Sequence, residues 1–190
     1  MCPITCETSW NSCSPILQPP FSPNQSRFFE TSTCTFVAVT DPERRAWVAE
    51  RYRRAFRAYI GPALEAAEDP AFPEVTRRNM RSAQHLAEHL EEVPVLLFVA
   101  GWTRAGRPQH QALFPAVQNI LLACRAVGLG ASLTMQHAAF RRELDEWLGL
   151  PAERPSCAML PIGWPRGRYG RPPRKSVDDC LHWERFSDDA

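Results

Sequence analysis

Lysine is almost absent from this chain of 190 residues, since Lys175 is the single lysine among 22 basic residues. These basic side chains nearly balance 21 acidic ones and leave a formal net charge of +1. A domain that binds nucleic acid through its phosphates normally carries a clear basic surplus. Composition therefore gives no electrostatic case for a nucleic-acid partner, and the arginine bias is more typical of codon usage than of phosphate binding.

Long apolar runs are also missing. No stretch approaches the roughly 18 apolar residues that a bilayer-spanning helix requires. The first residues, MCPITCETSWNSCSP, lack a basic segment followed by an apolar one, so they do not form a secretory signal. We therefore expect a cytoplasmic protein without a membrane partner.

Metal-binding spacings are missing as well. The seven cysteines contain no CxxC pair, which gives little support to a zinc site, and reduced cysteines of a cytosolic protein are the better interpretation. His85 and His89 lie four residues apart on a predicted helix and could share a metal. No third ligand is evident and the spacing differs from HExxH, so solvated helix histidines are favoured.

The chain does contain enough apolar sequence for one core. Hydrophobic residues make up 44% and charged residues 23%, which is ordinary for a globular protein, and the length suggests a single domain. Residues 1–24 mix Pro, Ser, Cys and Thr without periodicity, which is typical of poorly ordered segments. We expect an atypical N-terminal segment at 1–35 and a folded domain at 36–190.

Strand-like and helix-like patterns alternate along the folded domain. The expected strands cover residues 33–40, 93–100 (in the middle of the sheet) and 156–163. The expected helices cover residues 44–60 (with Asp41 as N-cap and a break at Gly61-Pro62), 76–90, 112–127 and 137–148. Residues 101–110 are expected to form a polar loop and 177–183 an extended tail. The helix at 112–127 is apolar nearly all round, which predicts a central, buried position.

Gly128 to Met135, GLGASLTM, follows that apolar helix. Two glycines two residues apart allow positive φ and a close approach of the backbone to a planar ligand. Helix C-caps show the same pattern, and Gly128 and Gly130 are expected to end the helix in this way. The segment is not a dinucleotide-binding fingerprint, because it follows a helix rather than a strand.

Arg166 to Lys175, RGRYGRPPRK, places five cations within ten residues of a Pro- and Gly-rich loop. Arginine binds phosphate oxygens through two parallel hydrogen bonds, so this loop could hold a phosphate. A solvated basic loop is the alternative. Neither interpretation is decided by the loop alone.

Taken together, these segments resemble a known family. EVPVLLFVA, LFPAVQNILLACRAVGLGASLTM, RRELDEWLGLP, MLPIGWP and RPPRK occur in the order and at the spacing typical of FMN-dependent nitroreductases. FVAVTDPERR is similar to the early strand and following helix of that family, and VDDCLHWERF to its closing segment. The resemblance covers roughly Phe36 to Phe186.

The resemblance implies an α+β fold in which an antiparallel sheet is flanked by helices. It also implies an intertwined homodimer with one FMN at each of two subunit interfaces. In such proteins the turn after the long central helix lies against the isoalloxazine ring of the flavin. By position, the cofactor-binding residues of that turn are Gly130, Ser132, Leu133, Thr134 and Met135.

The basic residues before the C-terminal tail hold the FMN phosphate in this family. By position these are Arg174 and Lys175, with Arg171 nearby, and the tail would cross onto the partner subunit. The family's N-terminal arginine cluster and its Gln-Pro-Trp element have no counterpart before Phe36, where the chain reads RFFETSTCT.

The resemblance implies an FMN-dependent oxidoreductase that passes electrons from NAD(P)H to nitroaromatic, quinone or similar small-molecule acceptors. The flavin carries the redox chemistry, so no catalytic side chain is required. The alternative is a flavin-poor pseudoenzyme or binding scaffold that lacks the N-terminal half of the FMN site. A third possibility is a relative that dehalogenates its substrate or cleaves flavin, although the short loop at 101–110 leaves little room for a lid.

Overall fold

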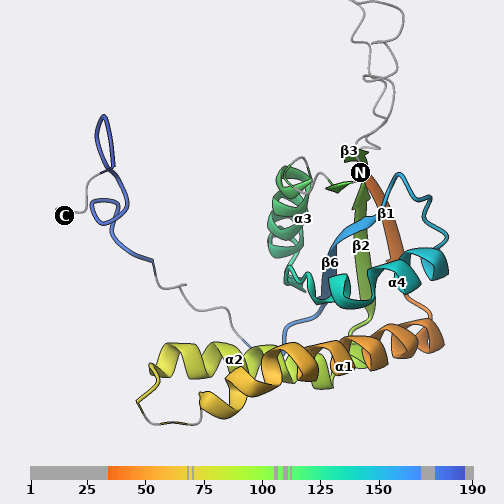
Figure 1. Ribbon diagram of the computed structural model, residues 1–190, viewed down its shortest axis with the longest axis horizontal. Helices are drawn as coiled ribbons and strands as arrows, with labels where there is room; N and C mark the ends of the chain where they lie inside the picture. Colours follow the sequence, from red (N-terminus) through yellow and green to blue (C-terminus); the bar gives the residue numbers. More distant parts are fainter. Residues whose placement is uncertain are drawn as a thin grey trace, which may run out of the picture.

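A four-stranded antiparallel sheet with strand order β1-β2-β6-β5 organises the fold (Figure 1). The computed structural model describes residues 34–67, 69, 71–104, 107–108, 111, 113–167 and 174–186. The sheet strands are β1 (Cys34–Val39), β2 (Val95–Gly101), β5 (Gly130–Ala131) and β6 (Ser156–Gly163). The three strand predictions are confirmed to within two residues, and β2 lies between β1 and β6, as its continuous apolar sequence indicates.

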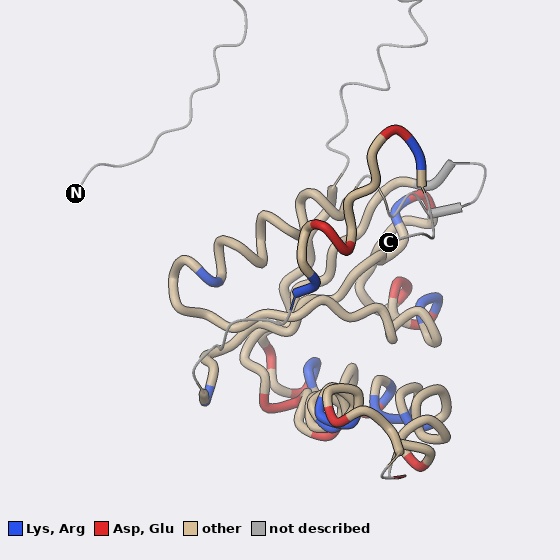
Figure 2. The backbone as a smooth tube through the Cα atoms, turned by 90° about the vertical axis from the view of Figure 1, so that its left-hand side faces the viewer, with Lys and Arg blue, Asp and Glu red and all other residues tan. Residues whose placement is uncertain are grey.

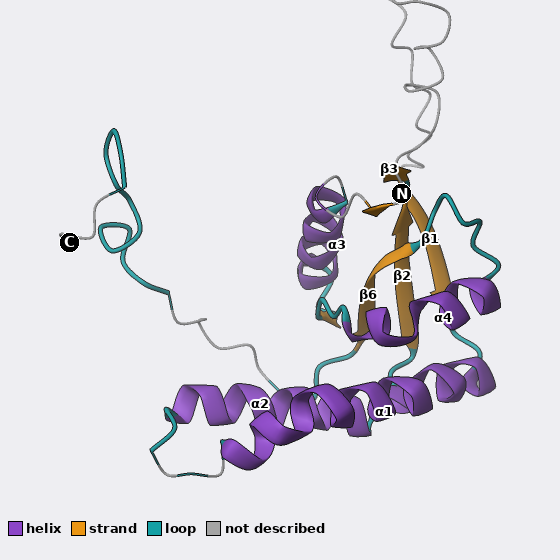
Figure 3. Cartoon of the chain, in the orientation of Figure 1, coloured by secondary structure: helices purple, strands orange, loops and turns teal. Residues whose placement is uncertain are grey.

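Helices cover both faces of this sheet (Figures 1 and 3). They are α1 (Pro42–Ala66), α2 (Glu74–Glu88), α3 (Phe114–Ala126) and α4 (Arg141–Leu148), with short 3₁₀ helices η3 (Leu90–Glu92) and η5 (Gln136–Phe140). The predicted cap of α1 is confirmed, because the Asp41 carboxylate accepts a hydrogen bond from the Arg44 amide at 2.9 Å. The α+β class is therefore confirmed for the described residues.

Strand β2 divides the core into two parts, because its side chains alternate between the sheet faces. Leu96 and Phe98 pack with α1, with Leu90 of η3 and with Leu144 of α4. Val99 belongs to the opposite cluster, in which Val117 of α3 packs on Leu160 of β6. The sheet is thus buried on both faces, which leaves its edge as the surface from which a ligand can approach.

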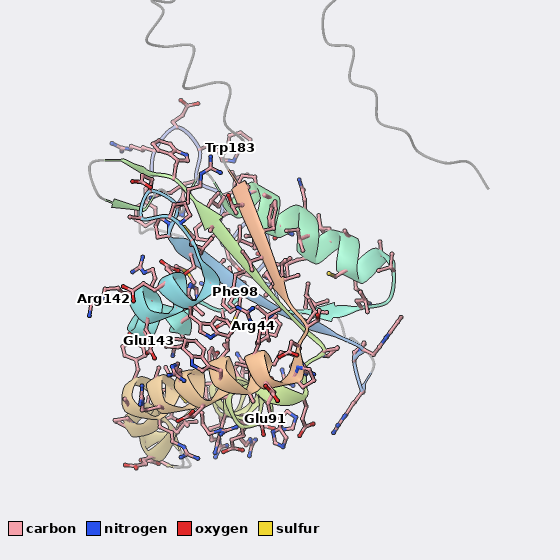
Figure 4. All side chains as sticks on the ribbon, turned by 90° about the vertical axis from the view of Figure 1, so that its right-hand side faces the viewer. Arg44, Glu91, Phe98, Arg142, Glu143 and Trp183 are labelled. Atoms are coloured by element: carbon pink, nitrogen blue, oxygen red, sulfur yellow. The ribbon has the colours of Figure 1, made fainter. Side chains whose placement is uncertain are left out.

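Two tryptophans join α1 to α4. The rings of Trp47 and Trp147 stack with centroids 4.4 Å apart and planes 1° from parallel. The guanidinium of Arg44 lies 4.3 Å from the Trp147 ring, and that of Arg51 lies 3.7 Å from the Trp47 ring. Arg51 also donates to the Glu143 carboxylate at 2.7 Å, and this hydrogen bond lowers the pKa of that carboxyl. Figure 4 shows Glu143 on α4, next to α1. Arginines here serve as stacking partners.

The expected break at Gly61-Pro62 is wrong, because α1 continues to Ala66. Proline has a helical φ and costs one intrahelical hydrogen bond. Ile60 and Leu64 on either side of the pair pack against the main core. That burial offsets the lost bond, and the chain leaves the helix only after Ala66.

The expected burial of the 112–127 helix is also wrong for the single chain. Of the residues in α3, only Val117 and Cys124 are buried, while Phe114 and Leu122 are exposed, Leu122 by 57%. Figure 2 shows that charged residues gather on α1 and α2, whereas α3 carries almost none. One sheet face can cover only one side of a helix, so the rest of this apolar surface faces outward.

Three smaller expectations need correction. The loop at 101–110 contains a short antiparallel pair, β3 (Thr103–Arg104) with β4 (Arg107–Pro108), which is too short to show strand periodicity. The helix at 137–148 begins at Arg141, after the 3₁₀ turn η5. The tail at 177–183 is not extended, because the Cys180 and Leu181 amides both donate to the Val177 carbonyl at 3.0 and 2.9 Å.

The expected poorly ordered segment at 1–24 lies outside the described residues. Among the residues that are described, no helix combines the length and the apolarity needed to cross a membrane.

Replacing Trp147 with alanine tests the contact between α1 and α4. Loss of the stacked ring and of the Arg44 contact should lower the free energy of unfolding by about 2–3 kcal/mol, somewhat less than for a fully buried tryptophan. Tyr59→Ala is the control, since Tyr59 is 75% exposed on α1 and should contribute nothing measurable. Urea unfolding followed by circular dichroism checks this. Equal loss in both variants would contradict a structural role for the stack.

Candidate functional site

Residues 130–134 form the edge of the sheet beside β6. Gly130 pairs with Gly163, and Thr134 exchanges two backbone hydrogen bonds of 3.0 Å with Met159. The Ser132 amide donates to the Pro161 carbonyl at 3.4 Å. In an antiparallel ladder the intervening residues direct their amides away from the neighbouring strand. The amides of Ala131 and Leu133 therefore point toward the open edge.

Glycine has a defined role at the entry to this edge. Gly128 adopts φ of 82° directly after α3, a backbone conformation that disfavours residues with a side chain. The prediction that Gly128 ends the helix agrees with this geometry. Gly130 is not part of the cap, because it already belongs to β5.

Tyr52 anchors the far end of the same segment. Its hydroxyl lies 2.9 Å from the hydroxyl of Thr134, which in turn lies 3.4 Å from the Gln136 amide. Burial raises the pKa of the Tyr52 phenol, and the hydrogen bond to Thr134 lowers it by less. A neutral phenol from α1 thus holds Thr134 against the core while Leu133 and Met135 remain exposed.

Two hollows flank the 130–136 segment. The first, which we name the α2–β6 hollow, has a volume of about 510 Å³ and includes His85, His89, Gly130, Ser132, Trp164 and Arg166. The second, the α1–α2 hollow, has a volume of about 790 Å³ and includes Tyr52, Phe56, Met80, His85, Ser132 and Thr134. His85, Leu86 and Ser132 line both hollows. The segment is therefore accessible from two sides.

The structure brings together most of the residues that the resemblance assigns to the flavin ring. Gly130 and Ser132 line the first hollow, and Ser132, Leu133 and Thr134 line the second. Met135 follows them as an exposed side chain.

The residues assigned to the phosphate lie elsewhere. Arg174 and Lys175 are exposed at the start of a tail that leaves the helices and sheet (Figure 1). Arg171 lies outside the described residues. Within one chain, the described structure does not bring the Arg174–Lys175 pair to the 130–136 segment.

Two residues that line the α2–β6 hollow, His85 and His89, are the pair for which the sequence favoured solvated helix histidines. His85 of α2 and His89, the C-cap of that helix, line the α2–β6 hollow together with the 130–132 segment, and their helical spacing alone does not reveal this. Arg166 lies beside them, with its guanidinium 3.3 Å from the Glu92 carboxylate. Among the described residues there is no group of three or more His, Cys, Asp or Glu side chains that could hold a metal ion.

A model of the Nitroreductase family matches residues 22–164, about three quarters of the chain. The protein therefore belongs to the Nitroreductase family. The match begins before β1 and ends at Trp164, so the tail lies beyond it. No curated protein sequence matches the chain.

Solved structures share the fold at low sequence identity. An oxidised iodotyrosine deiodinase bound to FMN and 3-iodo-L-tyrosine is 20% identical, with a TM-score of 0.61, and the match covers 81% of this chain and 77% of that one. The FMN- and NADPH-dependent nitroreductase NfnB from Sphigopyxis sp. strain HMH is 20% identical, with a TM-score of 0.54 and 81% of each chain covered. A BluB-like flavoprotein from Clostridium difficile 630 is 18% identical, with a TM-score of 0.51 and 80% of each chain covered.

Replacing Tyr52 with phenylalanine tests the anchor of the segment. Loss of the hydrogen bond to Thr134 should cost about 1 kcal/mol of stability at neutral pH. The parent should also lose stability as the pH rises above about 10, because the unfolded chain then releases a phenolic proton that the folded chain retains. Tyr52→Phe should remove the part of the alkaline loss that sets in above about pH 10. The buried Cys157 thiol, whose pKa burial also raises, should give both proteins a decline that begins at lower pH. Urea unfolding between pH 8 and 11 measures both effects.

Tyr59→Phe is the control, because Tyr59 is exposed on the same helix. It should leave both the neutral stability and the alkaline decline unchanged. Parallel alkaline declines in the parent and in Tyr52→Phe would contradict the assignment of the decline to Tyr52.

Proposed function

We propose that this protein is an FMN-dependent oxidoreductase that passes electrons from NAD(P)H to small aromatic acceptors such as nitroaromatics or quinones. The observation that carries the proposal is the open sheet edge at 130–134, with a hollow on each side. Family membership and the fold shared with FMN-binding structures support it. The hollows lie where a planar ring and its reaction partner can meet.

The residues of the edge fit a flavin ring. The outward amides of Ala131 and Leu133 can hydrogen-bond the polar atoms at the rim of the ring. The exposed side chains of Leu133 and Met135 offer apolar surface for its face. The missing Cβ at Gly130 lets a planar group approach the backbone. When bound, FMN supplies the electron and hydride transfer. The protein orients the flavin ring and partly shields it from water.

A single chain does not provide a complete binding site for the FMN phosphate. Arg166 is already paired with Glu92, and Arg174 and Lys175 lie in the tail. Cations of the tail would reach a flavin most simply if the tail of one subunit lies against the edge of another. The alternative function, a flavin-poor scaffold, follows if these cations never meet the edge.

An FMN titration tests the proposed function. The parent should bind FMN and then oxidise NADH or NADPH in the presence of a nitroaromatic or a quinone. Arg174→Ala/Lys175→Ala should weaken FMN binding by about tenfold or more, since each charge-assisted hydrogen bond contributes about 1.5–3 kcal/mol. Arg142→Ala, which removes an exposed arginine of α4, is the control and should bind FMN as the parent does. Absence of FMN binding by the parent in absorbance and fluorescence titrations would favour the scaffold.

We also propose that the functional unit is a homodimer. Leu122 of α3 and Val127, which follows that helix, are exposed. Leu181 and Trp183 in the tail are exposed as well. Monomeric proteins rarely leave such neighbouring apolar side chains uncovered, and a second copy is the occupant that covers both regions at once.

Replacing Leu122 with glutamate tests the dimer. A charge in an apolar interface is costly unless it is paired, so the variant should shift from dimer to monomer in light scattering at micromolar concentration. Val75→Glu is the matched control, because Val75 is also exposed but lies on α2, away from α3. A parent that is already monomeric at this concentration would contradict the proposal.

A further inference from the structure

The α2–β6 hollow contains a pair of histidines to which the proposed function gives no role. The ring centroids of His85 and His89 lie 4.1 Å apart with their planes tilted by 32°. His85 is exposed and His89 is half-buried, and both line the hollow. The two rings are thus close enough to contact one ligand together.

The position of one proton in the pair follows from the geometry. Nδ1 of His89 lies 2.9 Å from the His85 carbonyl oxygen, which can only accept a hydrogen bond. Nδ1 therefore carries a proton, and Nε2 of the neutral ring is an acceptor. Protonation of the ring converts Nε2 into a donor, so His89 changes from repelling an anion to binding one.

The remaining charges of the hollow cancel. Glu92 is held by Arg166 at 3.3 Å, so this acidic and this basic side chain contribute no net charge to the lining. The histidines therefore decide the net charge of the lining.

Charged groups on neighbouring elements lie outside the lining of the hollow. On α2, Glu88 accepts a hydrogen bond from Gln84 at 2.9 Å, and Arg81 lies one turn before His85. On α1, Arg53 forms an ion pair of 3.2 Å with Glu91 of η3 and donates to the Glu88 carbonyl.

Apolar rings also line the hollow. Trp164 is 75% exposed there, beside Pro94, Pro161 and Pro165. A Cβ added at Gly163 would lie 3.0 Å from Cδ of Pro94, so glycine keeps this part of the lining closely packed. An indole and proline rings offer a surface against which an aromatic ring can stack.

We propose that the α2–β6 hollow binds a planar aromatic carboxylate, with the ring against Trp164 and the carboxylate on the protonated His85–His89 pair. The hollow shares Gly130 and Ser132 with the candidate flavin edge, so the bound acid is the electron acceptor. The acceptor role rests on the proposed function, whereas the binding itself does not. Affinity increases as the pH falls, because the ligand binds the protonated pair.

The probes are 4-nitrobenzoate and its neutral analogue 4-nitrobenzamide, whose binding is measured by quenching of tryptophan fluorescence with and without saturating FMN. Binding of 4-nitrobenzoate should tighten about three- to tenfold from pH 8 to pH 5.5, as expected for one partly exposed charge-assisted contact. Binding of 4-nitrobenzamide should not change. Trp164→Phe should remove most of the quenching and thereby place the ligand in this hollow.

His85→Gln/His89→Gln should abolish the pH dependence, whereas His182→Gln should keep it, since His182 packs on Phe186 in the tail. Glu92→Gln should tighten 4-nitrobenzoate binding about threefold at pH 8, because it releases Arg166. Glu92→Gln therefore tests the site without altering either histidine.

Three results would overturn the inference. The first is an equal pH dependence for both probes, and the second is an unchanged dependence in His85→Gln/His89→Gln. The third is competition between FMN and 4-nitrobenzoate, which would assign the hollow to the cofactor's own ring and phosphate. A chain that binds 4-nitrobenzoate as expected but binds no FMN would overturn the proposed function and leave the binding site intact.

Discussion

The backbone pairing of residues 130–134 with β6 is the interaction on which the candidate site depends. Thr134 exchanges two hydrogen bonds with Met159, and this pairing turns a connection between two helices into the edge of a sheet. The edge supplies aligned outward amides that a free loop would not hold in one plane. The Tyr52 hydroxyl then keeps Thr134 in place from the opposite face. Both hollows include residues of this edge.

Burial of the sheet on both faces explains why the edge is available. Phe98 and Val99 are neighbours in β2 and belong to different core clusters. Helices occupy both faces as a result, and a planar ligand has access only where the sheet ends. The same arrangement leaves α3 with one side on the sheet and an apolar side without a partner in the single chain.

Arginine has more than one physical role in this protein. Arg44 and Arg51 stack on tryptophans at the contact between α1 and α4, and Arg45 donates to the backbone carbonyls of Glu91 and Val93 at 2.6 and 2.8 Å. Arg166 neutralises a carboxylate in the first hollow. These positions show why a count of arginines in the sequence does not locate a phosphate site.

The sequence by itself determined the elements whose signals are local. A continuous apolar run defined β2, Asp41 and Pro42 defined the start of α1, and Gly128 defined the end of α3, because caps and buried strands depend on residues close together in the chain. Tertiary contacts decided the rest. Packing around Ile60 and Leu64 carries α1 through a proline, and a single sheet face leaves half of α3 exposed. His85 of α2 and Ser132 line the same hollows, although they lie 47 positions apart in the chain. No local sequence pattern predicts this proximity, because it depends on how two distant segments pack against the same strand.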